Sequence, residues 1–272
     1  ARVKAKSLAE RTLCDYKHNI IPLKMYFGRM MPASITPKNV QSYIDMQAEA
    51  GRPVRGNHEV ACMSSCMSWL LRTQDTGMQI NPCMQKSGTK ANSETPRDRY
   101  VTHDEYKAVW QAAGKQVRLM MDLTYRTLQR PESDIIKWTP ANVTRDAQGA
   151  RVIKHRQHKT GIWLQIGLTP EIEKMIDQAI GKVPMLRQPI VHNRAGEQYT
   201  YSGIHSMLKA QISRLNVKRK KDGLPPILTF GFRDLKGKGA TDMWLSGVPI
   251  EQIQMLCSHK DKNTTEIYIK AR

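Results

Sequence analysis

The chain has 272 residues, of which 40% are hydrophobic and 25% charged, and this composition excludes wholesale disorder and a fibrous repeat. Its formal net charge of +19 makes a polyanion the first partner to consider, with nucleic acid ahead of an anionic membrane surface. The sequence shows neither a run of roughly 18 apolar residues nor the apolar stretch of a signal peptide, so we expect a cytoplasmic protein.

The five cysteines form an odd, scattered set that does not resemble a disulfide framework. Cys62 and Cys66 lie four residues apart on a predicted helix and could share a metal ion, but the nearby sequence supplies no further Cys or His pair to complete a tetrahedral site. We therefore expect buried free thiols and no metal or other cofactor.

Apolar residues at helical spacing predict three helices in the first part of the chain. The first follows a capping box at residues 7–10, the second opens at Thr36-Pro37, and the third runs from about residue 57 to 71, after a break at Gly51-Arg52-Pro53. Residues 85–97 are polar, as in an exposed linker. The pattern predicts an all-helical unit over residues 1–87 and a linker over residues 88–97.

The second domain, residues 98–272, is predicted to be mainly helical with a small antiparallel sheet. It opens with a capping box at residues 102–105 and a further helix near residues 117–127. Alternating apolar residues then predict strands at about residues 143, 152–155 and 163–166, with turns at residues 146–149 and 159–161. The last four predicted helices begin near residue 170 and cover about residues 201–215, 234–246 and 250–257.

Most familiar catalytic motifs are missing from the sequence, including a Walker phosphate loop, HExxH, GxSxG and a Gly-rich dinucleotide turn. A basic protein can still act on a phosphodiester without metal if cationic side chains surround the phosphate and another side chain is the nucleophile. Suitable residues occur in five fragments: Gln129-Arg130-Pro131-Glu132, His158-Lys159-Thr160-Gly161, Arg233-Asp234-Leu235-Lys236, Ser258-His259-Lys260 and Thr264-Thr265-Glu266-Ile267-Tyr268.

In this order and near this spacing, the fragments resemble the tyrosine recombinases, particularly phage integrases, whose pattern is Arg, Lys, His-x-x-Arg, His or Trp, then Tyr. The resemblance is most specific near the C-terminus, through Gly239-Ala240-Thr241 and the stretch from Leu245 to Tyr268. It implies that residues 1–87 are a helical core-binding, DNA-binding domain and that residues 98–272 are the catalytic domain.

The resemblance also implies a role for each matching residue. Tyr268 would attack the scissile phosphate and form a 3′-phosphotyrosine. Arg130 would clamp the nonbridging oxygens, Lys159 would protonate the departing 5′ oxygen, and His259 would hydrogen-bond the phosphate or assist proton transfer. The bond energy would be stored in the phosphotyrosine, so neither ATP nor metal is implied.

Two departures from the family pattern matter. Arg233 stands at the usual His position and Lys236 at the second Arg position, where lysine keeps the charge but loses the bidentate fork. Either the clamp is altered, Arg233 takes over phosphate binding, or the enzyme is impaired. The usual carboxylate three residues after Arg130 is replaced by Ser133, with Glu132 and Asp134 on either side, so the orienting carboxylate is not assigned.

The leading hypothesis is a site-specific DNA recombinase that clamps duplex DNA between two basic domains and acts as a homotetramer on two sites. Specificity residues are expected on the helix at residues 57–71 and near residues 209–221. The sequence leaves open whether a host DNA-bending protein or a directionality factor takes part. The alternatives are a noncatalytic DNA-binding protein on the same fold, with the altered 233–236 motif as its feature, and a type IB topoisomerase.

Overall fold

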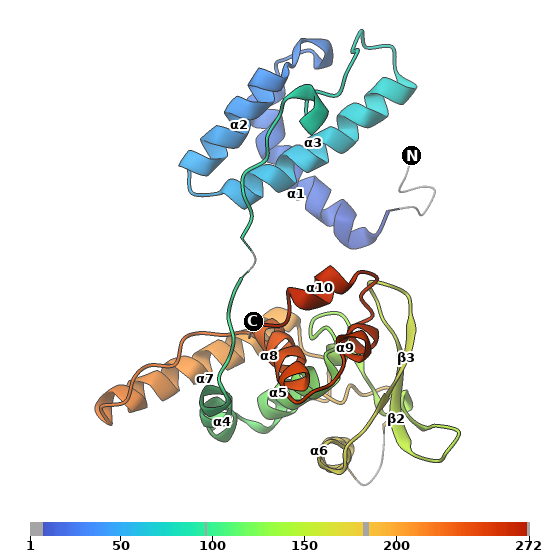
Figure 1. The fold of residues 1–272 in the computed structure, drawn as a ribbon, viewed down its shortest axis with the longest axis vertical. Coiled ribbons are helices and arrows are strands. Elements are labelled where there is room, and N and C mark those ends of the chain that lie inside the picture. Colours follow the sequence, from blue (N-terminus) through green and yellow to red (C-terminus); the bar gives the residue numbers. More distant parts are fainter. Residues whose placement is uncertain (1–7, 96, 182–184, 271–272) are drawn as a thin grey trace. The chain divides into compact units, whose positions relative to one another are not determined.

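The computed structural model describes residues 8–95, 97–181 and 185–270. The chain forms two compact units, Ala1–Pro96 and Arg97–Arg272, and the change from one to the other falls at the end of the predicted linker. Figure 1 shows a helical first unit, and helices together with a small sheet in the second.

The first unit contains helices α1 (Glu10–Phe27), α2 (Pro37–Glu49) and α3 (Pro53–Thr73) and two short 3-10 helices, Pro32–Ser34 and Gln85–Ser87. Helix α2 starts as predicted, since the Thr36 hydroxyl accepts from Asn39 N and the Asn39 side chain accepts from Thr36 N. Helix α3 starts earlier than predicted because Pro53 occupies its first turn, where the missing N–H costs nothing. Helix α1 has Ala9 as its N-cap, and Ser7 of the predicted capping box lies outside the described residues.

Helices α2 and α3 are joined by a buried carboxylate. Glu59 on α3 is 1% exposed and accepts hydrogen bonds from the Tyr43 hydroxyl at 2.6 Å and from Arg55 Nε at 2.8 Å. These bonds satisfy a charge that would otherwise be costly inside the core. The prediction of buried thiols is wrong at Cys14 and at Cys66, which are both exposed, whereas Cys62, one turn before Cys66 on α3, is buried. All five thiols are free.

The predicted linker is partly fastened to the first unit. Thr89 is buried and donates to the Pro82 carbonyl, and Lys90 N donates to Gln41 Oε1 at 2.9 Å. Asn92 N donates to Asn57 Oδ1, again at 2.9 Å. Farther along, Asn57 Nδ2 donates to Glu94 Oε1 at 2.8 Å, so the segment is extended but hydrogen-bonded as far as Glu94, rather than solvated throughout.

The second unit is mainly helical with a three-stranded sheet, so the predicted fold class is confirmed (Figure 1). Its α-helices and strands are α4 (His103–Ala112), α5 (Lys115–Thr127), β1 (Val143–Arg145), β2 (Arg151–Arg156), β3 (Trp163–Gly167), α6 (Pro170–Ile180), α7 (Tyr201–Lys221), α8 (Phe232–Leu245), α9 (Ile250–Cys257) and α10 (Lys262–Glu266).

The sheet is antiparallel in the order β1-β2-β3. Ile153 on β2 pairs with Ile166 on β3, and both side chains are buried. The neighbouring pair, Lys154 and Gln165, is exposed. From Ile153 onward, residues of β2 alternate between the core and solvent, as the predicted strand requires, whereas Val152 is buried on the same face as Lys154.

Helices α5 and α8 approach each other so closely that their backbones touch. A Cβ on Gly239 of α8 would overlap the Tyr125 carbonyl oxygen and would lie 2.6 Å from Leu128 Cδ2. Only glycine fits this crossing. Leu128 then packs with Ala240, Ile253 and Cys257 in a small apolar cluster against which Tyr268 lies.

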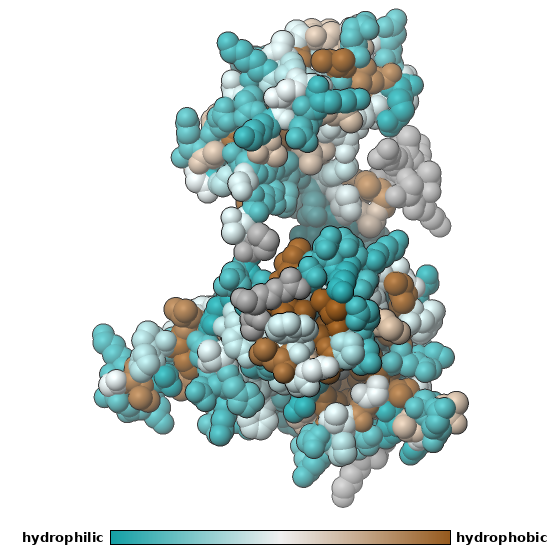
Figure 2. All heavy atoms as spheres, in the orientation of Figure 1, coloured by the Kyte–Doolittle hydropathy of each residue, from teal (hydrophilic) through white to brown (hydrophobic). Residues whose placement is uncertain are grey.

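The surface of the second unit is mainly polar, and the last turn of α7 carries four consecutive basic residues, 218–221. Figure 2 shows apolar side chains gathered amid this polar surface over α8 and the C-terminal segment, where Leu245 and Ile267 are more than half exposed.

Within the described residues, none of the helices combines the length and apolar character needed to cross a membrane.

Candidate active site

Arg130 is placed by an abrupt end to α5. Leu128 adopts a left-handed backbone conformation, with φ of 54°, and turns the chain so that Arg130 leaves the helix axis. The Arg130 Nη1 atom donates to Gln157 Oε1 at 3.1 Å and lies 3.7 Å from Asp134 Oδ2. One edge of the guanidinium is thus fixed by the protein.

The sequence left open which carboxylate near Ser133 orients Arg130, and the structure places Asp134 beside it. Asp134 is the carboxylate beside Arg130, and its other oxygen accepts from His158 N at 2.9 Å, at the start of the β2–β3 turn. Glu132 instead pairs with the Arg233 guanidinium on α8. The two acidic residues that flank Ser133 therefore serve different cations.

Lys159 lies on the β2–β3 turn, with its side chain exposed. The turn is closed by hydrogen bonds from Gln157 N to the Ile162 carbonyl and from Gly161 N to the Gln157 carbonyl. Lys159 is near enough to His259 to lower its pKa. Lys159 is therefore one of two exposed cations among the six predicted site residues, the other being Arg233.

Arg233 and Lys236 begin α8 but occupy opposite environments. The Arg233 side chain is 70% exposed, and its pKa is raised chiefly by its hydrogen bond to Glu132. Lys236 is 3% exposed, and among the described residues no atom accepts a hydrogen bond from its Nζ. Burial lowers the pKa of Lys236, and its ammonium lies 5.0 Å from the centre of the Tyr268 ring.

Tyr268 and His259 stack on each other. Their ring centroids are 5.2 Å apart with an interplanar angle of 26°. Ser258, the second non-glycine residue with positive φ among those described, ends α9 in a left-handed conformation immediately before His259. His259 Nδ1 lies 3.1 Å from the Thr265 hydroxyl on α10, just before Tyr268.

The chain that carries Tyr268 is anchored to α8. The Thr241 hydroxyl donates to the Tyr268 carbonyl at 3.2 Å and accepts from Lys270 N at 2.9 Å. Ile269 is buried between these two points. The position of the phenol is therefore set by the helix that also carries Lys236.

The charges of these residues shift one another's titration. Burial raises the pKa of Tyr268, whereas Arg130 and Arg233 act in the opposite direction. Burial lowers the pKa of His259 to about 4, assisted by the nearby cations Lys236, Arg130 and Lys159. At neutral pH the imidazole is uncharged, so it offers one donor and one acceptor nitrogen.

The structure thus brings Arg130, Arg233, Lys236, His259 and Tyr268 together, with Lys159 at the edge. Sequence reasoning missed two buried amides, Gln129 and Gln157, which link the segments bearing these residues. A glutamine at a strand end or after a helix carries no signal of such a role, because its partners come from distant parts of the chain.

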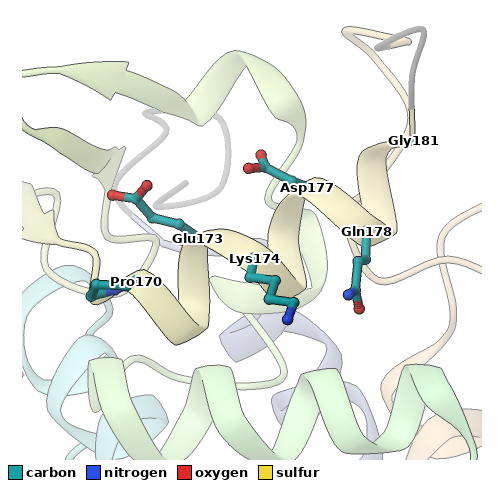
Figure 3. Close-up of a pocket in the computed structure, with 6 residues that line it drawn as sticks. All are labelled: Pro170, Glu173, Lys174, Asp177, Gln178 and Gly181. Atoms are coloured by element: carbon teal, nitrogen blue, oxygen red, sulfur yellow. The ribbon is translucent and has the colours of Figure 1, made fainter.

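Hollows also occur elsewhere, and one of them, lined by residues of β3 and α9, borders His259. The one beside α6, drawn in Figure 3, is lined by Pro170, Glu173, Lys174, Asp177, Gln178 and Gly181. It contains none of the predicted site residues, and its Asp177 is paired with Arg151. Across the described ranges, His, Cys, Asp and Glu side chains form no cluster suited to a metal ion.

Residues 99–272 match the model of the phage integrase family. The chain belongs to this family, and so to the tyrosine recombinase class. Among curated protein sequences, none matches significantly.

Solved structures with the same fold include lambda integrase (residues 75–356), crystallised as a dimer bound to a COC′ core site. It has a TM-score of 0.78 and 19% identity, with 99% of this chain and 92% of that chain covered. The Tn1549 transposon integrase in complex with circular intermediate DNA has a TM-score of 0.74 and 13% identity, with 98% and 92% covered.

Proposed function

We propose that this phage integrase family member is a site-specific DNA recombinase that cleaves and rejoins strands through a 3′-phosphotyrosine on Tyr268. The observation that carries the proposal is the surroundings of the phenol. Its ring lies against the His259 imidazole and the Lys236 ammonium, with Arg130 and Arg233 close enough to lower its pKa. A phenol amid four such groups suits attack on a phosphate better than a structural role.

The chemistry follows from where the charges lie. The Tyr268 oxygen attacks phosphorus and a P–O bond forms, while the bond from phosphorus to the 5′ oxygen breaks. Arg130 and Lys236 stabilise the additional negative charge of the pentacoordinate state. Lys159, whose side chain is exposed, delivers a proton to the departing 5′ oxygen.

The phenol proton needs an acceptor, because a free tyrosine titrates near 10 and burial raises the pKa of Tyr268 further. His259 is the proposed acceptor: its imidazole is uncharged at neutral pH, and it becomes a stronger base once a DNA phosphate offsets the cations that, after burial, lower its pKa. Rejoining is the reverse attack by a 5′ hydroxyl on the phosphotyrosine, in which His259 returns the proton to Tyr268.

Arg233 is proposed to bind phosphate after leaving Glu132. Its guanidinium is 70% exposed and is held by one carboxylate, Glu132, whose side chain is 25% exposed. A DNA phosphate can therefore compete for it. This would supply the planar fork that Lys236 lacks.

The partner is proposed to be double-stranded DNA, gripped by the core-binding domain at residues 1–87 and the catalytic domain at residues 98–272. Similar folds appear in a lambda integrase dimer on a core site and a lambda integrase tetramer on a Holliday junction. By analogy, we propose a homotetramer on two DNA sites in the cytoplasm of a bacterial host. A host bending protein or directionality factor fits the same scheme.

A noncatalytic DNA-binding protein is the second candidate, and the Arg233–Glu132 pair favours it, because the pair neutralises a cation of the site. The test is covalent trapping on nicked duplexes of varied core sequence, without added metal. We expect an SDS-resistant adduct at a 3′ phosphate with the wild type, none with Tyr268→Phe, and an undiminished yield with Tyr199→Phe, a partly buried tyrosine before α7. Salt-sensitive binding with no adduct would favour the second candidate, and relaxation of site-free plasmids would favour a topoisomerase.

A further inference from the structure

Two buried glutamines lie where three segments of the candidate site converge. Gln157 is 1% exposed at the start of the β2–β3 turn, and Gln129 is 0% exposed one residue before Arg130. Gln157 Nε2 donates to Gln129 Oε1 at 2.6 Å. The two amides form a bridge between the end of α5 and the turn that carries Lys159.

The bridge extends to the end of α9. Gln129 Nε2 donates to the Leu256 carbonyl at 2.7 Å and to the Thr127 carbonyl at 2.9 Å, and Gln157 Nε2 reaches the Cys257 carbonyl at 3.5 Å. The last two residues of α9 are therefore tied to the segment bearing Arg130. His259 follows two residues after Cys257.

The orientation of each amide is fixed by its partners. Gln157 Oε1 faces two donors, Arg130 Nη1 at 3.1 Å and the Thr160 hydroxyl at 2.8 Å, while its Nε2 faces two carbonyl oxygens. Turning either amide over would set donor against donor and acceptor against acceptor. Because every amide N–H is used inside the core, the arrangement is specific rather than one of several equivalent packings.

Gln157 differs from Asp134 in how it holds Arg130. An amide oxygen accepts a hydrogen bond without a negative charge, so it orients the guanidinium without neutralising it. Gln157 and Asp134 both face Nη1, and no partner for Nη2 or Nε is found among the described residues. The guanidinium is thereby oriented with most of its N–H groups available to an incoming anion.

Resting on the proposed function, we propose that Gln157 is a positioning residue for strand cleavage: it orients Arg130 toward the scissile phosphate and, with Gln129, keeps the segments carrying Lys159 and His259 in register. It does not touch the substrate. A misplacement of about 1 Å at a distance from the chemistry can cost on the order of 100-fold in rate, so a polar bridge of this kind has a measurable effect.

The test compares Gln157→Met, which is similar in size but lacks the amide, with Gln148→Met on the exposed β1–β2 turn. At saturating nicked duplex, we expect the adduct-forming rate constant of Gln157→Met to fall by about 10- to 100-fold while the Kd for DNA changes less than about twofold. Gln148→Met should match the wild type in both. A Gln157→Met rate within twofold of the wild-type rate would overturn the inference.

A double-mutant cycle separates positioning from general support of the fold. If Gln157 acts through Arg130, adding Gln157→Met to Arg130→Lys should slow the reaction by less than about twofold beyond Arg130→Lys alone. Fully multiplying effects would contradict the orientation of Arg130 by Gln157. Thermal unfolding of each variant checks that the second unit remains folded.

A further readout does not require any reaction. In the wild type, NMR of ¹⁵N-arginine-labelled protein should show a distinct, slowly rotating Arg130 guanidinium, assigned with Arg130→Lys. This signature should be lost in Gln157→Met and kept in Gln148→Met. An unchanged Arg130 signal in Gln157→Met overturns the inference, whereas a wild type that forms no adduct but shows the restrained guanidinium overturns the proposed function alone.

Discussion

Two lysines on the same helix show opposite ways of burying a charge. Lys238 on α8 is 0% exposed and pairs with Asp242 at 2.9 Å, beneath the rings of Tyr100 and Tyr125. Lys236, two residues earlier and 3% exposed, has no acceptor among the described residues. The first ammonium is satisfied within the protein and the second is not.

The difference separates stability from reactivity. A buried ammonium without an acceptor destabilises the fold, and such a group persists where something outside the chain completes it. Lys238 holds the beginning of the second unit to α8 through Tyr100. Lys236 instead faces Tyr268, where we propose that a DNA phosphate supplies the missing partner.

The largest effect on stability is expected when Lys238 loses its partner, Asp242. Asp242→Ala would leave Lys238 buried without its carboxylate and remove the acceptor of two tyrosine hydroxyls, so we expect a loss of about 3–5 kcal/mol in the free energy of unfolding. Urea unfolding measures it. Glu251→Ala, which breaks the exposed pair with Lys262, should cost less than about 1 kcal/mol. Equal losses in the two variants would refute the contrast.

Removing the charge of Lys236, the ammonium without an acceptor, should not lower the free energy of unfolding. Lys236→Met removes a buried charge that lacks a partner, so we expect the free energy of unfolding to stay constant or rise by about 1–2 kcal/mol. The rate of adduct formation should fall by at least about 100-fold, because one cation beside the phosphate is lost. Urea unfolding and trapping on the same preparation test both; a clear loss of stability with full activity would show that Lys236 is structural.

We expect the loss of stability at acidic pH to depend on His259. Its folded-state pKa of about 4 lies below the ordinary value of 6.5, so its contribution to stability is complete above pH 6.5 and is lost as pH falls toward 4. His259→Gln, which cannot be protonated, should therefore lose about 1–2 kcal/mol less between these two pH values than the wild type. Urea unfolding at each pH measures this, with exposed His103→Gln as the control. Identical pH dependence in His259→Gln and wild type would contradict the assignment.

The smallest effect concerns the identity of the cation. Lys236→Arg restores a planar fork, and we expect adduct formation to rise about three- to tenfold over the wild type, as it would in an enzyme limited by its clamp. Trapping time courses at saturating DNA measure the ratio. An unchanged or lower rate would mean that the site functions best with lysine at position 236.

Much of the fold could be predicted from the sequence, because the period of apolar residues is local. The alternation of apolar residues in the second unit predicted the strands of a small antiparallel sheet, Thr36-Pro37 marked the start of α2, and a capping box marked the start of α4. The start of α3 was missed because Pro53 both ends one pattern and begins the next helix.

The site was predictable only in part. The order of basic residues brought attention to Arg130 and Tyr268, but three other features depend on how distant segments meet. These are the choice of Asp134 over Glu132 as the partner of Arg130, the burial of Lys236, and the bridge through Gln157. The first follows from the left-handed turn at Leu128, which no local pattern announces.

The contact at Gly239 has a consequence for how this protein can vary. Since α5 and α8 meet main chain to main chain, the spacing between the helix that precedes Arg130 and the helix that carries Lys236 is set by the backbone rather than by the volumes of core side chains. Apolar residues elsewhere in the core can be exchanged and repacked without altering the spacing between these two helices. A single added methyl at position 239 would reset it.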